Sequence, residues 1–435
     1  MIEIVRRTDT KQRKIKLQSI AGRSVALGTE LLTTVNNIIE DVRTRGDAAL
    51  IEYTRRFDDV MLAPEDLRVK EETLQRSAAR VEAPVLEALR EAIRRVRFFH
   101  EHERTESWEI KTDNGSRLGQ RITPVERAGL YVPGGTASYP SSVVMNVVPA
   151  QVAGVPRIVV TTPPRTLAET PAVAAVLLEL GVTEIYAVGG AQAIAALAYG
   201  TETIPRVDRI TGPGNKYVAA AKKIVFGAVG IDSIAGPTEV VIIADETARA
   251  SFVAADLLAQ AEHDEDASAV LITTSDELAS EVYEELVKQT QTLPRREIIA
   301  RSLKQYGAII VVDEIAEACA IANELAPEHL EIITRDDDAA ADLIKHAGAI
   351  FFGAHTPEAV GDYFAGPNHV LPTGSSARFS SALGVNDFVR RTSLLRYSRE
   401  EMRDTAGMIA ALAHAEGLHA HARSALMRVE AKEES

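Results

Sequence analysis

Short β-rich runs that each end in glycine or proline recur along the middle of this chain, with helical stretches between them. The β-rich runs are "RIVVTTPP" (157–164), "EIYAVGG" (184–190) and "VDRITGPGN" (207–215), and the helical stretches are "PAVAAVLLELG" and "AQAIAALAYG". Alternation of strand and helix, with glycines after the strands, is typical of a parallel sheet covered by helices. The pattern therefore predicts an α/β fold.

A second series of strands and helices follows Gly236. Its β-rich runs read "TEVVIIAD", "SAVLITT", "AIIVV", "LEIIT" and "GAIFFG", and helices are expected to begin near Arg249, Asp276, Asp313 and Asp337. A chain of 435 residues is too long for one ordinary hydrophobic core, so several domains are expected. We predict two α/β units that are separated near "GIDSIAGPTE", with mostly helical sequence before the first unit and after the second.

Charge and cysteine content exclude several kinds of partner and site. The formal net charge of −14 argues against nucleic acid or a membrane surface as the main partner, because phosphate binding needs clustered Lys and Arg. Cys319 is the only cysteine, which rules out an intramolecular disulfide and a Cys-rich zinc site. The first residues are polar, and no later stretch is long and uncharged enough to span a bilayer, so we expect a cytoplasmic protein.

Three glycine-bearing turns follow predicted strands of the first α/β unit. They lie in "LYVPGGTASYPSS" (130–142), "VGGAQAIAAL" (188–197) and "ITGPGNKYVAAAKK" (210–223). Small residues before a helix let backbone amides and the helix dipole approach a phosphate. None of the turns matches G-x-G-x-x-G, and any one of them is more often a plain strand-to-helix turn. Because all three are expected at the carboxyl edge of one sheet, together they favour a nucleotide ligand.

An adjacent carboxylate and imidazole, Glu328 and His329, occur in "LAPEHLEIIT" at the predicted entrance to a strand. Two such side chains at neighbouring positions are suited to two proton transfers. A solvated loop pair is the commoner explanation for an isolated Glu-His dipeptide. The dipeptide alone leaves both interpretations open.

Metal-ligand residue types occur at three places that are far apart in the sequence. Gln260 and His263 are three residues apart at the end of a predicted helix, so they share one helix face. Asp362 and His369 lie in "GDYFAGPNHVLPTG", although Asp362 alone reads more simply as a cap or turn residue. Near Glu416 stand three histidines among which helical periodicity does not choose, namely His414, His419 and His421.

The three places together predict a zinc site made of Gln260, His263, Asp362 and one C-terminal histidine. Imidazole and carboxylate groups suit zinc, and an amide oxygen is an unusual fourth ligand. The spacing of these residues cannot establish the site by itself. The residues alone therefore indicate an α/β nucleotide enzyme with a candidate metal centre.

Seven sequence blocks resemble, in the same order, blocks of the histidinol dehydrogenase family. The longest is "IDSIAGPTEVVIIADETARASFVAADLLAQAEH" (231–263). The others are "ERAGLYVPGG", "GGAQAIAALAYGT", "GPGNKYV", "ELAPEHLE", "GDYFAGPNHVLPTG" and "EGLHAHAR". The resemblance extends from about Gly46 to Arg423 and so covers nearly the whole chain.

The resemblance implies two incomplete Rossmann-like α/β domains with parallel-rich sheets, and small helical N- and C-terminal segments that swap in a homodimer. The implied division begins with an N-terminal extension (1–24) and a discontinuous zinc and substrate domain (25–130 and 238–382). An NAD domain (131–237) and a C-terminal helical segment (383–435) complete it.

The implied activity is the zinc-dependent oxidation of L-histidinol to L-histidine, the last step of histidine biosynthesis, in two NAD-dependent steps through a bound aldehyde. His329 would act as general base, and Glu328 would activate water to attack the aldehyde. One zinc per subunit would be bound by Gln260, His263, Asp362 and, from the other subunit, His421.

The resemblance also implies the residues that bind the cofactor and the substrate. NAD would contact Tyr131, Gln192 and Asn215. The substrate would contact the four zinc residues and, in addition, Thr238, His329 and Glu416.

Three other functions compete with this one. A related zinc and NAD enzyme could oxidise another small alcohol such as a sulfonated diol, but the carboxylate of Glu416 suits a cationic amino-alcohol and would repel a sulfonate. A zinc hydrolase that uses Glu328 leaves the three glycine turns unexplained and predicts no NADH. A non-catalytic binding protein is disfavoured by the intact Glu328–His329 pair.

Overall fold

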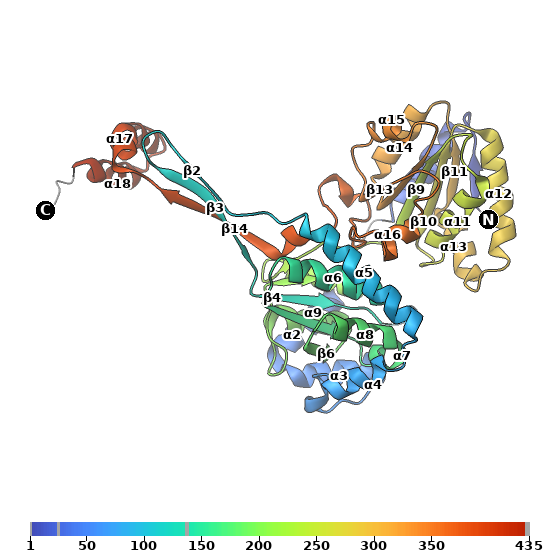
Figure 1. The fold of residues 1–435 in the computed structure, drawn as a ribbon, viewed down its shortest axis with the longest axis horizontal. Helices are drawn as coiled ribbons and strands as arrows, with labels where there is room; N and C mark the ends of the chain where they lie inside the picture. Colours follow the sequence, from blue (N-terminus) through green and yellow to red (C-terminus); the bar gives the residue numbers. More distant parts are fainter. Residues whose placement is uncertain (1, 24–26, 135–138, 431–435) are drawn as a thin grey trace. The chain divides into compact units, whose positions relative to one another are not determined.

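The computed structural model describes residues 2–23, 27–134 and 139–430, whose helices and strands are labelled in Figure 1. The chain divides into two compact units. The main unit comprises Met1–Glu103 and Glu126–Phe388. The small unit comprises Arg104–Val125 and Val389–Ser435. Neither unit is continuous in sequence, because the chain leaves the main unit after Glu103 and returns to it at Glu126.

The first sheet of the main unit has six parallel strands in the order β1-β11-β10-β9-β12-β13. The strands are β1 (Glu3–Val5), β9 (Glu239–Ala244), β10 (Ser268–Thr273), β11 (Ala308–Val311), β12 (His329–Ile333) and β13 (Ala349–Phe352). Along the central strand β9, Val240 and Ile242 pack into one core, and Val241 and Ile243 pack into the other. Both faces are therefore buried, which is why this strand reads as an unbroken apolar run.

Helices cover both faces of the six-stranded sheet. One face packs against α11 (Ala250–Ala261), α12 (Asp276–Thr290) and α13 (Arg296–Tyr306). The other face packs against α1 (Thr10–Ala21), α14 (Ile315–Leu325) and α15 (Asp337–Ala341). The short helix α16 (Glu358–Tyr363) follows β13 and contacts α11.

The second sheet of the main unit has five parallel strands in the order β6-β5-β4-β7-β8. The strands are β4 (Arg127–Tyr131), β5 (Arg157–Thr162), β6 (Glu184–Ala187), β7 (Arg209–Thr211) and β8 (Gly230–Ile231). The helices that connect them are α6 (Pro140–Val152), α7 (Thr166–Glu169), α8 (Pro171–Glu179), α9 (Gly190–Tyr199) and α10 (Lys216–Val225). The prediction of two parallel α/β sheets is thus confirmed.

The N-terminal helices pack differently from the implied division, which grouped residues 25–130 with residues 238–382. These helices are α2 (Thr29–Arg45), α3 (Asp47–Asp58), α4 (Glu71–Ala78) and α5 (Ala83–Glu101). The apolar stripe of α2, Val35, Ile38, Ile39 and Val42, packs with residues of α9 and α10 of the five-stranded sheet. A periodic apolar stripe shows that a helix face is buried, but it does not identify the sheet that buries it.

Two further segments differ from the implied division. Residues 1–24 are not a separate extension, because β1 pairs with β11 at the edge of the six-stranded sheet. The last segment (383–435) is not wholly helical, because it contributes the strand β14 (Val389–Arg396) to the small unit.

The small unit is an antiparallel sheet with a pair of helices. Its strands lie in the order β14-β3-β2, with β2 at Trp108–Lys111 and β3 at Arg117–Pro124. The helices α17 (Arg399–Ala415) and α18 (His419–Glu430) pack against each other through a small cluster of alanines. No helix in the described parts of the chain combines the length and the apolar character needed to cross a membrane.

Candidate active site

The predicted catalytic residues lie together at the amino edge of the six-stranded sheet. Thr238 immediately precedes β9, Glu328 immediately precedes β12, and His329 is the first residue of β12. β9 and β12 are neighbours, with His329 opposite Val240. The strand order reverses here, because the chain runs from β9 to β10 and β11 on one side and then returns to β12 on the other. Open α/β sheets usually bind ligands at the carboxyl edge of such a reversal point, so this site occupies the opposite edge.

Asp245 occupies the carboxyl edge of the same reversal point. It follows β9, and its carboxylate accepts hydrogen bonds from the backbone N–H groups of Thr247 (2.9 Å) and Arg335 (2.7 Å). The Asp245 side chain therefore joins the loops that follow β9 and β12.

Backbone and hydroxyl groups of residues 238 and 239 hold the catalytic pair. The Glu328 carboxylate accepts hydrogen bonds from the Thr238 hydroxyl and from the backbone N–H of Glu239 (3.1 Å). The His329 ring donates from Nδ1 to the carbonyl oxygen of Glu239 (3.3 Å). Because Nδ1 carries the hydrogen in this bond, Nε2 is the ring nitrogen that is free to accept a proton.

Burial sets the protonation of both residues. Desolvation raises the pKa of the Glu328 carboxyl to about 8 and lowers the pKa of the His329 imidazole to about 4, because a buried charge loses its hydration. His329 is therefore neutral at pH 7, as a general base must be. A cation bound close to Glu328 would lower the pKa of its carboxyl and favour the carboxylate.

Next to this pair, His263, Glu358 and Asp362 form a group whose ligand atoms all lie within 4.8 Å of one another. His263 follows the end of α11, while Glu358 and Asp362 are four residues apart on α16 and so share one helix face. One imidazole and two carboxylates are a donor set that suits zinc. The side chains therefore fit a divalent metal, and the group includes two of the predicted ligands.

The buried amide of Gln260 lies between Thr238 and Glu358. The Gln260 nitrogen lies 2.9 Å from each Glu358 carboxylate oxygen and donates to them, and the Gln260 oxygen lies 2.8 Å from the Thr238 hydroxyl oxygen. The Thr238 hydroxyl has one hydrogen. When that hydrogen is donated to Glu328, the Gln260 oxygen keeps its lone pairs free for another partner. The predicted ligand Gln260 thus adjoins the metal-binding group.

Glu358 is the residue of this site that the sequence interpretation missed. It is buried, and its Oε1 lies 3.9 Å from His329 Nδ1. The available signal was its position four residues before Asp362, which places both carboxylates on one face of a short helix. His369, the other metal-ligand type in this block, instead donates from Nδ1 to the carbonyl oxygen of Asp362 (2.9 Å).

The predicted NAD-binding residues lie at the carboxyl edge of the five-stranded sheet. Tyr131 ends β4, and its hydroxyl accepts a hydrogen bond from the N–H of Gly190 at the start of α9 (3.1 Å). Gln192 is buried in the first turn of the same helix. Asn215 caps α10, because its side-chain oxygen accepts from the N–H groups of residues 217 and 218. β4 and β7 flank the reversal point of this sheet, where nucleotide ligands are expected.

Four buried polar atoms at this edge have no hydrogen-bond partner among the described residues. They are Thr161 Oγ1, Thr162 Oγ1, Thr166 Oγ1 and Gln192 Oε1. Buried polar atoms without partners are rare in folded proteins, so each requires an explanation such as a ligand. A Cβ added at Gly189 would lie 2.6 Å from the ring of Pro163, so the turn there accepts no side chain. These features fit a nucleotide. Gly135–Ser138 of the first glycine turn lie outside the described residues.

The remaining predicted residues, Glu416 and His421, belong to the small unit. Glu416 follows the end of α17, and His421 lies in the first turn of α18. The His419 ring contacts the His414 ring, with 3.0 Å between their Nδ1 atoms. His421 follows His419 by two residues on α18.

Comparison with known proteins identifies the family. The profile described as histidinol dehydrogenase matches residues 23–429. The histidinol dehydrogenase of Geobacillus kaustophilus is 54% identical over 423 residues, which are 96% of this chain and 99% of the relative. That of Bacillus subtilis is 51% identical over 428 residues, again 96% and 99% of the two chains.

A solved structure supports the same family assignment. The crystal structure of histidinol dehydrogenase from Elizabethkingia anophelis has a TM-score of 0.93 and 35% identity to this chain, and the match covers 99% of this chain and 98% of the other. The motifs, the two parallel sheets and these matches lead to the same conclusion. The chain belongs to the histidinol dehydrogenase family and is an oxidoreductase.

Proposed function

We propose that the protein is a zinc-dependent enzyme that oxidises L-histidinol to L-histidine with two molecules of NAD, in the cytoplasm, as the last step of histidine biosynthesis. The observation that carries this proposal is the proximity of a metal-binding group, His263, Glu358 and Asp362, to the buried pair Glu328 and His329. An enzyme that oxidises an alcohol twice needs a group to orient the substrate and groups to move protons, and this site has both.

Zinc would be held by Gln260, His263 and Asp362, with His421 as the fourth ligand. When bound, zinc would orient the substrate through its imidazole and amino nitrogens. The buried carboxylate of Glu358, 2.9 Å from the Gln260 amide nitrogen, would keep the amide oxygen directed away from itself. Support from such neighbouring groups is a general requirement of metal sites.

His329 would take the proton of the substrate hydroxyl at Nε2. Its Nδ1–H is fixed on the carbonyl oxygen of Glu239, and burial keeps the ring neutral, so one nitrogen is held ready as a base. A positioned base of this kind contributes roughly 10²–10⁴-fold to the rate. As His329 removes the proton from the hydroxyl oxygen, hydride leaves the carbon that bears this hydroxyl for NAD, and the product is the aldehyde.

Glu328 would take a proton from the water that adds to the aldehyde. The Thr238 hydroxyl and the Glu239 N–H both donate to its carboxylate, which fixes its position at the strand entrance. His329 would then take a proton from the hydrated aldehyde as the second hydride leaves for a second NAD. Each oxidation therefore transfers one hydride, and one added water provides the second oxygen of the carboxylate product.

NAD would bind at the carboxyl edge of the five-stranded sheet, against Tyr131, Gln192 and Asn215. The hydroxyls of Thr161, Thr162 and Thr166 and the Gln192 oxygen support this placement, since they have no hydrogen-bond partner in the described part of the chain. NAD, when bound, accepts the hydride. The residues of this edge would orient the nicotinamide and keep water away from it.

We also propose a homodimer in which the small unit of one copy completes the active site of the other. The small unit exposes large apolar side chains, including Leu395 (75% exposed), Met408 (62%) and Leu412 (70%). Apolar side chains gathered on a unit with little core of its own favour burial against a second copy of the chain. Glu416 and His421 would then reach the substrate and the zinc of that second copy.

The test follows NADH formation from L-histidinol and NAD, with and without a chelator. We expect two NADH per L-histidinol, loss of activity on chelation and its recovery on addition of zinc. A protein that forms no NADH from L-histidinol would refute the proposal. Mixing an inactive His421→Ala protein with an inactive His329→Asn protein tests the shared site, because mixed dimers should regain part of the activity.

A further inference from the structure

The peptide that joins Thr238 and Glu239 supports both catalytic side chains. Its two residues donate a hydroxyl and an N–H to Glu328, and the Glu239 carbonyl oxygen accepts from His329. A shift of this short segment would therefore move the proton-accepting groups of both steps together.

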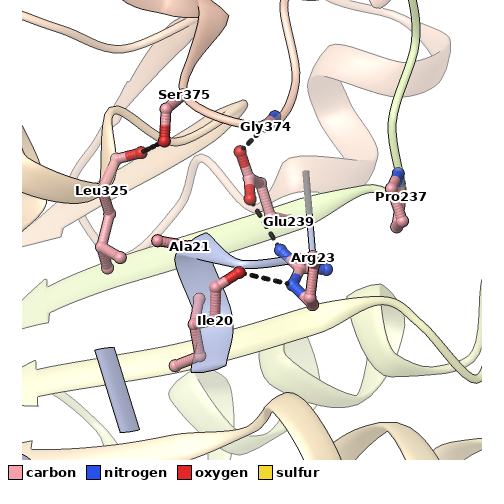
Figure 2. A pocket seen from close by; sticks show the side chains of 8 residues that line it. All are labelled: Ile20, Ala21, Arg23, Pro237, Glu239, Leu325, Gly374 and Ser375. Atoms are coloured by element: carbon pink, nitrogen blue, oxygen red, sulfur yellow. Dashed lines mark hydrogen bonds and ion pairs between the residues drawn. The ribbon is translucent and has the colours of Figure 1, made fainter. Parts of the chain in front are cut away.

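Arg23 binds this segment through the carboxylate of Glu239 (Figure 2). Its guanidinium group donates to the carbonyl oxygens of Thr238 (3.4 Å) and Asp266 and to the carboxylate of Glu239 (2.7 Å). Its Nε donates to the carbonyl oxygen of Ile20 (3.1 Å) at the end of α1. One planar group with five donors in a fixed arrangement thus connects α1, the entrance of β9 and the turn before β10.

The partner carboxylate of Glu239 is anchored at its other oxygen. Oε1 accepts the backbone N–H of Gly374 (3.0 Å), as Figure 2 shows. The Arg23 and Glu239 side chains are only 4% and 10% exposed. The cavity beside them, between Leu325 and Ser375, has a volume of about 10 Å³, which is room for no more than about one water molecule.

A buried ion pair in this place needs a reason other than stability, because well-packed apolar residues often stabilise a fold equally well. We propose that Arg23 is a positioning residue for catalysis: by fixing residues 238 and 239 it places Glu328 and His329 for their proton transfers. This inference rests on the proposed function, since it assigns the chemistry to those two residues. The inference thus assigns a role in catalysis to Arg23, a residue of the N-terminal segment.

The test compares Arg23→Lys with a matched control, Arg13→Gln. Arg13 lies on α1, the helix that ends two residues before Arg23, and its ion pair with Glu317 (2.8 Å) joins that helix to α14 without involving residue 238 or 239. Lysine keeps the charge at position 23 but cannot reach Glu239 and both carbonyl oxygens in the same geometry. We expect kcat of Arg23→Lys to fall by roughly 10–100-fold, with the KM for L-histidinol and the zinc content near those of the wild type.

Arg13→Gln should lose little thermal stability, because its ion pair is partly exposed, and should keep the wild-type kcat. Wild-type kcat in folded Arg23→Lys, or an equal fall of kcat in both variants, would overturn the inference, because the arginine would then only dock helix α1. If Arg23→Lys does not fold, Glu239→Gln replaces it, since this change removes the ion pair and keeps the backbone N–H and carbonyl of residue 239. A fall of kcat with unchanged KM supports the inference, and wild-type kcat overturns it. A wild-type protein that makes no NADH would instead contradict the proposed function.

Discussion

The two parallel sheets of the main unit place their candidate sites at opposite edges. In the five-stranded sheet, Tyr131 and Gln192 lie at the carboxyl edge beside the reversal of strand order. In the six-stranded sheet the strand order also reverses, between β9 and β12, but Glu328 and His329 lie at the amino edge. The first arrangement follows the general rule for open α/β sheets, and the second departs from it.

The difference follows from which groups each edge provides. The carboxyl edge has helix N-termini and glycine turns, whose N–H groups suit the phosphates of a nucleotide. The amino edge of the six-stranded sheet instead receives the C-terminal end of α11 with Gln260 and His263, and the side chains of α16. Side chains, rather than backbone N–H groups, therefore make the second site, and side-chain ligands are what a metal and proton transfer require. Four substitutions test whether the carboxyl edge binds the nucleotide while the amino edge binds the metal and transfers protons.

The largest effect is expected from the loss of the base at the amino edge. In His329→Asn the ring nitrogen that accepts protons is absent, so NADH formation from L-histidinol should slow by roughly 10²–10⁴-fold. Zinc content and NAD affinity should stay at the wild-type level, because His329 belongs to neither set of ligands. The measurement is steady-state NADH absorbance, together with metal analysis and NAD titration. A weakened affinity for NAD would show that the two edges are not separate in function.

A smaller effect is expected on the metal. Glu358→Gln removes a buried carboxylate from the metal-binding group and from the Gln260 amide. Loss of a group that supports a metal ligand costs roughly 10–100-fold in metal affinity, which competition with a chromophoric chelator would measure. The control is Glu331→Gln, a buried carboxylate that is not a proposed ligand, where the glutamine oxygen can still accept the Glu358 N–H (2.9 Å). Equal zinc affinities in the two variants would argue against a specific role of Glu358.

At the carboxyl edge of the other sheet, Gly189→Ala should weaken NAD binding and leave zinc binding intact. The added methyl group would lie 2.6 Å from the Pro163 ring, and overpacking of this kind costs roughly 1–3 kcal/mol. About 1.4 kcal/mol of that cost, if expressed in binding, is a tenfold higher Kd. Fluorescence titration with NADH measures the change. Gly28→Ala is the control, since a methyl group there meets none of the described residues within 4 Å, and its Kd should equal that of the wild type.

The smallest expected effect is on stability without metal. Folding raises the pKa of the Glu328 carboxyl to about 8, whereas in the unfolded chain it ionises near 4.5. Between about pH 6.5 and 8 the folded protein therefore binds more protons than the unfolded chain, so stability falls as pH rises. Glu328→Gln should reduce the slope of Tm against pH across this range. His329, whose pKa is lowered, affects stability only below this range, so a slope that remains unchanged in Glu328→Gln would assign the effect to other buried carboxyls.

The sequence predicted the fold class, and it grouped some residues that the structure brings together. The three-residue spacing of Gln260 and His263 placed both at one helix end, and the glycine turns follow strands of the five-stranded sheet at its carboxyl edge. Spacing could not show that α16 brings Asp362 to His263 across about a hundred residues, since that proximity depends on sheet order. It also gave no reason to single out Glu358, because a buried carboxylate and a solvated one look alike in a sequence.

The packing of the N-terminal region shows the same limit. The apolar periodicity of α2 is clear in the sequence, yet the helix packs on the five-stranded sheet and not with residues 238–382. A stripe of apolar side chains specifies burial but not the partner. The role of β1 was equally hidden, because three residues are too few for a strand pattern to be recognised.

That short strand has a consequence for the solution behaviour of the protein. β1 pairs with β11 (Ala308–Val311), all of whose residues are buried. Without Glu3–Val5, β11 would become the outermost strand and present unpaired backbone groups beside apolar side chains. Exposed edges of this kind recruit strands from other molecules. Proteolytic trimming of only a few residues at this end would therefore cause self-association before it affected the chemistry, and light scattering would detect it while activity was still normal.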